Sequence, residues 1–267
     1  MKDILRIQFR QALKQKGVPV AGFLVNLTGF AFLMMDSGDI GETPKTATES
    51  LPEMLYIFAA IALFVGAMII GQCCGSDFTD HTINHEALAG RSRAAIYFGR
   101  AIPALILAPL SVLLISILPF ILYGFVHGWG NTVPVSVLMQ RTVLAVFPLL
   151  RISSFWIFIL FIFRHPVAPV IAAFPAFVLS LGFSTGLEKI AFFELIRKIP
   201  CLLSCGNLID LLRIKRWEVY NLSLEQFFTY DFAMAGTYIV QTVGISLAMS
   251  AVYLLLGYHF FHLDDMH

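Results

Sequence analysis

The chain has 267 residues, of which 58% are hydrophobic and only 13% charged, and its mean hydropathy is +0.80. Soluble domains carry about 25% charged residues, so this composition excludes an ordinary globular protein. It is typical of an all-α polytopic membrane protein, which we expect to form a single domain over 1–267. The net charge is +1, and there is no basic run or aromatic RNA-binding motif, so no nucleic-acid partner is expected.

The first segment, 1–17, is polar and basic instead of continuously apolar. Leu5, Phe9 and Leu13 recur every four residues, and lysines and arginines fall between them. This pattern predicts an amphipathic helix that lies in the membrane interface and contacts anionic lipid headgroups. Nucleic-acid binding is the weaker alternative for this helix, because no other feature of the chain supports it.

Six apolar runs follow, each long enough for a helix to cross a bilayer core of roughly 30 Å. They occupy 18–35, 54–74, 101–127, 142–163, 166–184 and 233–258. Arginines cluster after the second run, and the positive-inside rule assigns such a cluster to the cytoplasm. We therefore expect a multi-pass protein of the plasma membrane, with six transmembrane helices and both termini in the cytoplasm.

Two of these runs contain residues that affect helix packing. Gly71 and Gly75, at the end of the second run, have the small-xxx-small spacing that lets backbones approach closely in lipid. Pro103, Pro109 and Pro119 remove backbone donors from the third run, and they predict that its helix is bent.

The polar segment 75–100, between the second and third runs, differs from everything around it. Its acids and histidines come first and its arginines last, in the order Asp77, Asp80, His81, His85, Glu86, Arg91, Arg93 and Arg100. A loop of this length is too short to be a catalytic domain, yet it is more patterned than a simple connection. We interpret it as a cytoplasmic segment that another protein binds.

The order of residues in this loop also resembles a family pattern. It supplies an acidic and an aromatic residue, a Thr-Ile step, a short helix ending in Leu, a Ser-Arg pair and a further basic residue. These are Asp77, Phe78, Thr82, Ile83, Leu88, Ser92, Arg93 and Arg100. The pattern is similar to the segment after the second span in the permeases of type-2 ABC transporters. The chain departs from it at His81, where the family usually has Gly, and at Arg100, where Lys is commoner.

The resemblance implies that 75–100 carries a coupling helix, which docks on a separate ATPase subunit. The apolar side chains would then serve as anchors and the acids as charges at the rim of the interface. The implied ATPase-coupling residues are Asp77, Phe78, Asp80, His81, Thr82, Ile83, Glu86, Leu88, Arg93 and Arg100. The same family begins with an interfacial elbow helix, which 1–17 resembles.

The resemblance also sets the expected function and partners. The loop looks most like that of Gram-positive bacterial permeases that expel antimicrobial peptides, of the lantibiotic-immunity kind. It implies an ATP-driven exporter built from nucleotide-binding ATPase subunits and two permease chains, identical or related, in a bacterial membrane. The alternative is a self-contained secondary carrier or a membrane scaffold protein.

The segment 185–232, before the last run, mixes apolar clusters with charges and is too polar to span. We expect it to be extracellular and to form amphipathic helices at the outer leaflet. The re-entrant helices of type-2 permeases are similar. Cys201 and Cys205 in this segment leave a disulfide possible, although a helical spacing of four residues would strain it.

Arg151 lies near the middle of the fourth run, where a charge costs on the order of 3 kcal/mol. No acid lies inside any of the six runs. As a functional residue, Arg151 would face a polar cavity, a partner subunit or a bound anion, which makes it a candidate for the translocation pathway. As a structural residue, it would extend to the membrane surface or pair with an acid of 185–232. The sequence leaves both interpretations open.

The sequence lacks the residue motifs of nucleotide-binding and zinc-binding sites. It contains no Gly-x-x-x-x-Gly-Lys-Ser/Thr phosphate loop, so ATP and Mg²⁺ are expected on the partner ATPase and no cofactor on this chain. His81 and His85 have a spacing that can bind zinc, but their order is not H-E-x-x-H and no third ligand is evident. We therefore expect a transport subunit without a metal site, and not an enzyme.

Overall fold

The computed structural model describes Leu27, 46–80, 82–130, 134–185, Leu208, 215–220, 226–231, Met234 and 236–263. The predicted helix over 1–17 lies outside these residues, as does the first predicted span apart from Leu27. His81, Cys201 and Cys205 also lie outside them.

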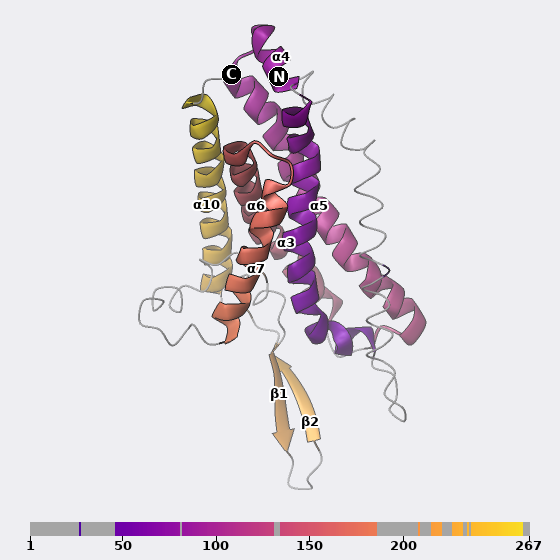
Figure 1. Cartoon of the computed structure of the whole chain (residues 1–267). Coiled ribbons are helices and arrows are strands. Elements are labelled where there is room, and N and C mark those ends of the chain that lie inside the picture. Colours follow the sequence, from indigo (N-terminus) through magenta and orange to yellow (C-terminus); the bar gives the residue numbers. More distant parts are fainter. Residues whose placement is uncertain are drawn as a thin grey trace.

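Long apolar helices make up most of the described chain (Figure 1). They are α3 (Ala47–Thr79), α5 (Arg93–His127), α6 (Val135–Phe163), α7 (Ala168–Thr185) and α10 (Gly236–Leu263), with the short α4 (Thr82–Leu88) between α3 and α5. By length and composition, α5, α6 and α10 can each cross a membrane, and Leu63–Thr79 within α3 is a shorter apolar helix. The chain is thus a helical membrane protein, while the count of six spans stays a prediction.

The helices lie alongside one another, with α4 at one end of the bundle and a β-hairpin at the other (Figure 1). We call these the α4 end and the hairpin end. In an apolar stretch of α6, 56% of the residues are buried in the molecule, against 17% for α10. Helix α6 is therefore central, and α10 is a peripheral helix that packs mainly on α6.

The hairpin corrects one prediction. Strand β1 (Lys215–Tyr220) pairs antiparallel with β2 (Gln226–Asp231), although 185–232 was expected to form helices and the fold to be all-α. The strands read KRWEVY and QFFTYD, and such aromatic and β-branched residues favour strands. Elsewhere in this segment, Leu208 is buried in the main hydrophobic core.

The backbones approach closely where α3 meets the connection between α6 and α7. A Cβ atom on Gly71 would lie 2.2 Å from the carbonyl oxygen of Pro166, and one on Gly75 would lie 2.6 Å from the Cα of Pro166. Arg164 ends α6 in the left-handed conformation (φ 51°), and its N–H donates to the carbonyl of Leu160 at 2.7 Å. The close approach predicted for these glycines is present, but a tight turn occupies the space instead of a parallel helix.

At the hairpin end, α3 is bonded to the residues that follow α5. The N–H of Ala47 donates to the carbonyl of Gly128 at 3.1 Å, and Thr48 Oγ1 donates to the carbonyl of Trp129 at 2.8 Å. Gly124 leaves room for the Trp129 indole, because a Cβ there would lie 2.9 Å from the ring. Helices α3 and α5 are therefore joined at this end as well as through α4.

Candidate functional site

The predicted coupling segment consists of two helix ends with a short helix between them. Helix α3 continues past its predicted end to Thr79, whose Oγ1 donates to the carbonyl of Ser76 at 2.7 Å. The chain then turns into α4, and Gly90 (φ 80°) adopts the left-handed conformation after it. Ser92 caps α5, because its Oγ accepts the N–H of Ala95 at 3.3 Å.

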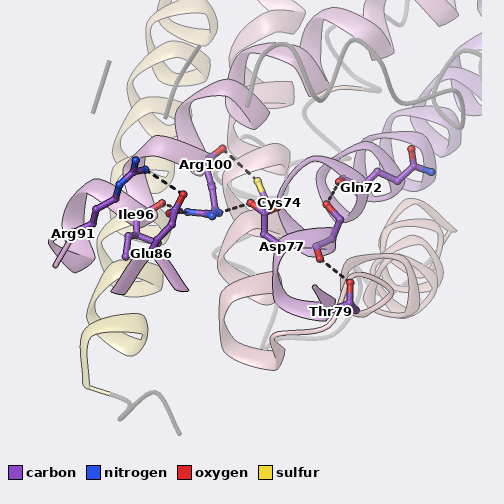
Figure 2. A network of polar contacts seen from close by, with 9 residues as sticks. Gln72, Cys74, Asp77, Thr79, Glu86, Arg91, Ile96 and Arg100 are labelled. Carbon is purple, nitrogen blue, oxygen red and sulfur yellow. Dashed lines mark hydrogen bonds and ion pairs between the residues drawn. The ribbon is translucent and has the colours of Figure 1, made fainter. Parts of the chain in front are cut away.

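A buried ion cluster joins all three of these helices (Figure 2). Arg100 of α5 donates from Nε to Asp77 of α3 at 2.6 Å and from Nη1 to Glu86 of α4 at 2.8 Å. The Arg100 side chain is fully buried, and Glu86 also pairs with the exposed Arg91 at 3.2 Å. Two carboxylates thus stabilise one buried guanidinium, and removing one partner of such a pair typically costs 3–5 kcal/mol.

The same cluster includes the backbone of α5. Nη1 of Arg100 also donates to the carbonyl of Ile96 at 3.3 Å, and the thiol of Cys74 donates to the carbonyl of Arg100 itself at 3.3 Å. Asp77 was predicted to supply a charge at the rim of an interface. This is wrong, because its carboxylate is buried inside the cluster.

The predicted apolar anchors separate into inward and outward side chains. Ile83 is buried, and Phe78 packs edge-on against Phe161 of α6 with the ring centroids 5.4 Å apart. Leu88, at the end of α4, is 84% exposed. Of the three anchors, only Leu88 is available to a partner, and Phe78 holds the end of α3 on α6.

Tyr97 forms a second junction at the α4 end. Its ring lies 4.5 Å from that of Phe161, and its hydroxyl donates to the carbonyl of Leu254 in α10 at 2.9 Å. Gly257 makes room for it, since a Cβ there would lie 2.6 Å from the Tyr97 oxygen. Tyr97 was not among the site residues predicted from the sequence; the available signal was an aromatic residue with a polar tip at the polar end of an apolar helix.

Arg93 connects the start of α5 to the end of α10. Its Nη1 donates to the carbonyl of His262 in the last turn of α10. The last carbonyls of a helix have no partner within the helix, and a cation there is favourable. Arg93, predicted as a coupling residue, therefore binds this chain's own last helix, together with Tyr97.

The exposed residues of this region form a surface that we call the α4 face. It consists of Thr79, Asp80, His85, Leu88, Ala89, Gly90, Arg91 and Ser92. Thr82 is half-buried beside it. Among the described residues, no three His, Cys, Asp or Glu side chains lie close enough together to hold a metal ion. The α4 face is suited to a protein partner, with one large apolar side chain, Leu88, among mainly polar residues.

The second candidate region is the seam between α6 and α10, where Arg151 is fully buried. One of its contacts is with α10, where Nη1 lies 3.7 Å from the sulfur of Met249. Thr242, Ser246 and Ser250 of α10 are buried as well. The interpretation in which Arg151 extends to the membrane surface is therefore wrong.

The sequence matches no family model and no curated protein. The resemblance to type-2 ABC permeases thus stays a proposal that depends on the residues of 75–100.

Proposed function

We propose that the chain is the membrane-spanning permease subunit of an ATP-driven exporter. The observation that carries this proposal is the Arg100 cluster, which fixes α4 to both α3 and α5 through contacts of 2.6 and 2.8 Å. A partner that displaces α4 would move two long helices with it. A loosely attached loop would absorb the same displacement.

The geometry of the cluster supports force transmission. Arg100 contacts the two acids with different nitrogens, so the guanidinium fixes three helices relative to one another. Arg93 and Tyr97 extend the connection to α10. A rigid-body displacement at α4 would therefore reach α3, α5 and α10.

The α4 face supports a docking role. Leu88 is its large exposed apolar side chain, and Asp80, His85 and Arg91 are exposed polar residues of the same face. An apolar anchor inside a polar rim is the usual composition of a small protein–protein contact. The partner is a nucleotide-binding ATPase, which would supply ATP and Mg²⁺.

The remaining parts of the proposal depend on the resemblance of 75–100. They are a second permease chain, identical or related, and an orientation with the α4 end and both termini in the cytoplasm of a bacterial cell. The substrate class is antimicrobial peptides of the lantibiotic type, or other amphipathic compounds in the membrane.

Photocrosslinking in cells tests the docking role. A photoreactive amino acid at Leu88 is expected to crosslink a nucleotide-hydrolysing subunit. The matched control is Leu118, an exposed residue of α5 within an apolar span, which should give no such product. Crosslinking of the ATPase from neither position, or equally from both, would refute the proposal.

A self-contained secondary carrier is the second candidate, and Arg151 favours it. Ionisable groups near the middle of a span often mark the substrate site of a carrier. The two candidates differ in one measurement, because transport by the purified chain alone in liposomes would support the carrier and exclude the exporter.

A further inference from the structure

The exposed faces of two spanning helices differ in composition. On α5, large aliphatic residues are exposed every four residues along the span, at Ile106, Leu110, Leu114, Leu118 and Leu122. Such side chains are suited to contact with lipid tails. One side of α10 instead exposes small and polar residues, although α10 is the least buried of the three spanning helices. Lipid contact alone does not account for this composition.

Six exposed residues of α10 fall on one line along the helix, which we call the α10 stripe. Their spacing alternates between four and three residues, the repeat that forms a continuous contact between two packed helices. The α10 stripe consists of Thr237, Gln241, Gly244, Ala248, Ala251 and Leu255. By helical geometry, larger exposed side chains flank it, with Val240 and Leu247 on one side and Val252 and Leu256 on the other.

The middle of the α10 stripe leaves space for another backbone. A Cβ atom on Gly244 would meet nothing within 4 Å in the described part of the chain, so no contact there requires a glycine. Gly257 differs, because a Cβ at that position would lie 2.6 Å from the Tyr97 oxygen. Small residues such as Gly244, Ala248 and Ala251 are typical of helix contacts in lipid, since they let two backbones approach closely.

Gln241 is an independent indication that a protein covers this face. Its side chain is exposed on the α10 stripe and makes no hydrogen bond within the described part of the chain. An amide without a hydrogen-bond partner is costly in an apolar medium. The glutamine amide carries both donors and an acceptor, so two copies of it can satisfy each other. The face is therefore complementary to itself.

We propose that the α10 stripe is the contact between two copies of this chain. Copies in one membrane have the same orientation, so a two-fold axis along the membrane normal places the two α10 helices parallel. Each residue of the α10 stripe then lies opposite its counterpart, with the Gln241 amides bonded to each other and the small residues in contact. The inference rests on the proposed function for the need of a second permease chain, and it makes that chain an identical copy.

The contact would lie on a helix that is joined to the coupling segment. Arg93 and Tyr97 of α5 donate hydrogen bonds to the carbonyls of His262 and Leu254 in α10. A displacement of α4 would therefore reach the interface between the two copies.

Crosslinking between two differently tagged copies in cell membranes tests the contact. A photoreactive amino acid at Ala248 is expected to give a product that carries both tags. The matched control is Leu114, which is 62% exposed on α5 and should give none. No doubly tagged product from Ala248, or equal amounts from both positions, would overturn the proposal. A product that joins Ala248 to a different protein instead would overturn it as well.

Energy transfer between labelled copies in liposomes measures the strength of association. Gly244→Leu/Ala248→Leu is expected to abolish association but to leave the melting temperature of the chain unchanged, because both residues are exposed. Gln241→Leu should weaken association about tenfold through the loss of hydrogen bonds between helices. Leu114→Ala is the control and should associate as the wild type does. An unchanged dissociation constant in either α10 variant would contradict the proposal.

The exporter proposal and the α10 contact fail separately. If Leu88 does not crosslink an ATPase while Ala248 still joins two copies, the exporter is refuted and the contact between copies stands. If the chain still associates after Gly244→Leu/Ala248→Leu while Leu88 crosslinks the ATPase, the second chain binds another face and only the α10 contact is refuted.

Discussion

Arg100 and Arg151 are equally buried, but their surroundings differ. Arg100 lies between Asp77 and Glu86 at hydrogen-bond distance, and its two ion pairs join three helices. Arg151 lies in the seam between α6 and α10, where one of its contacts is with the sulfur of Met249 at 3.7 Å. A buried charge surrounded by the chain's own acids is suited to holding a structure together. One buried arginine thus joins polar helix ends, and the other lies between two apolar helices.

The largest expected effect tests the first half of this comparison. Arg100→Ala should leave two carboxylates without their guanidinium and lower the free energy of unfolding by about 3–5 kcal/mol. Chemical denaturation in detergent measures this loss. Arg100→Lys is the control, because it keeps the charge but cannot contact both acids with a planar fork, so its loss should be smaller. An equal free energy of unfolding for the alanine variant and the wild type would show that the Arg100 cluster does not stabilise the fold.

The close contact of Gly71 with Pro166 tests whether the α4 end is as rigid as the Arg100 cluster suggests. Gly71→Ala places a Cβ 2.2 Å from a backbone oxygen of Pro166 and should cost about 1–3 kcal/mol. The matched variant Gly66→Ala meets only the Val112 side chain at 3.6 Å, an ordinary contact, and should be tolerated. Thermal denaturation of both variants measures the difference. If the two behave alike, the α6–α7 turn does not pack on α3 as described.

The smallest expected change in stability comes with a large change in function. Leu88→Asp alters an exposed side chain and should shift the free energy of unfolding by no more than about 0.5 kcal/mol. It should nevertheless uncouple ATP hydrolysis from transport, because the α4 face loses its apolar anchor. Assays of the reconstituted complex measure hydrolysis and transport together.

Phe78→Ala is a useful comparison with Leu88→Asp, because Phe78 packs inward on Phe161 whereas Leu88 is exposed. It should lower stability as well as coupling, whereas Leu88→Asp should lower coupling alone. Normal transport by the Leu88 variant would contradict the docking role of the α4 face.

The helices were largely predictable from the sequence, because uninterrupted apolar runs have few alternatives to a helix in lipid. The hydrogen-bond and ion-pair partners of the polar side chains could not be predicted from the sequence. The sequence gives the charges of 75–100 but not their distances, and Asp77 was assigned to a surface although it pairs with Arg100. The opposite orientations of Phe78 and Leu88 also follow from packing on α6, which no local pattern encodes. The hairpin was missed because its charged residues interrupt the alternation by which strands are recognised.

The contact of Pro166 with Gly71 and Gly75 has a consequence for biogenesis. The two glycines form a notch on a helix that leaves the ribosome well before the turn that fills it. During synthesis the notch therefore stays unfilled until the α6–α7 connection has been made. Translation that stops after α5 would leave an unfilled groove on α3, which is a surface that membrane quality-control proteases could recognise.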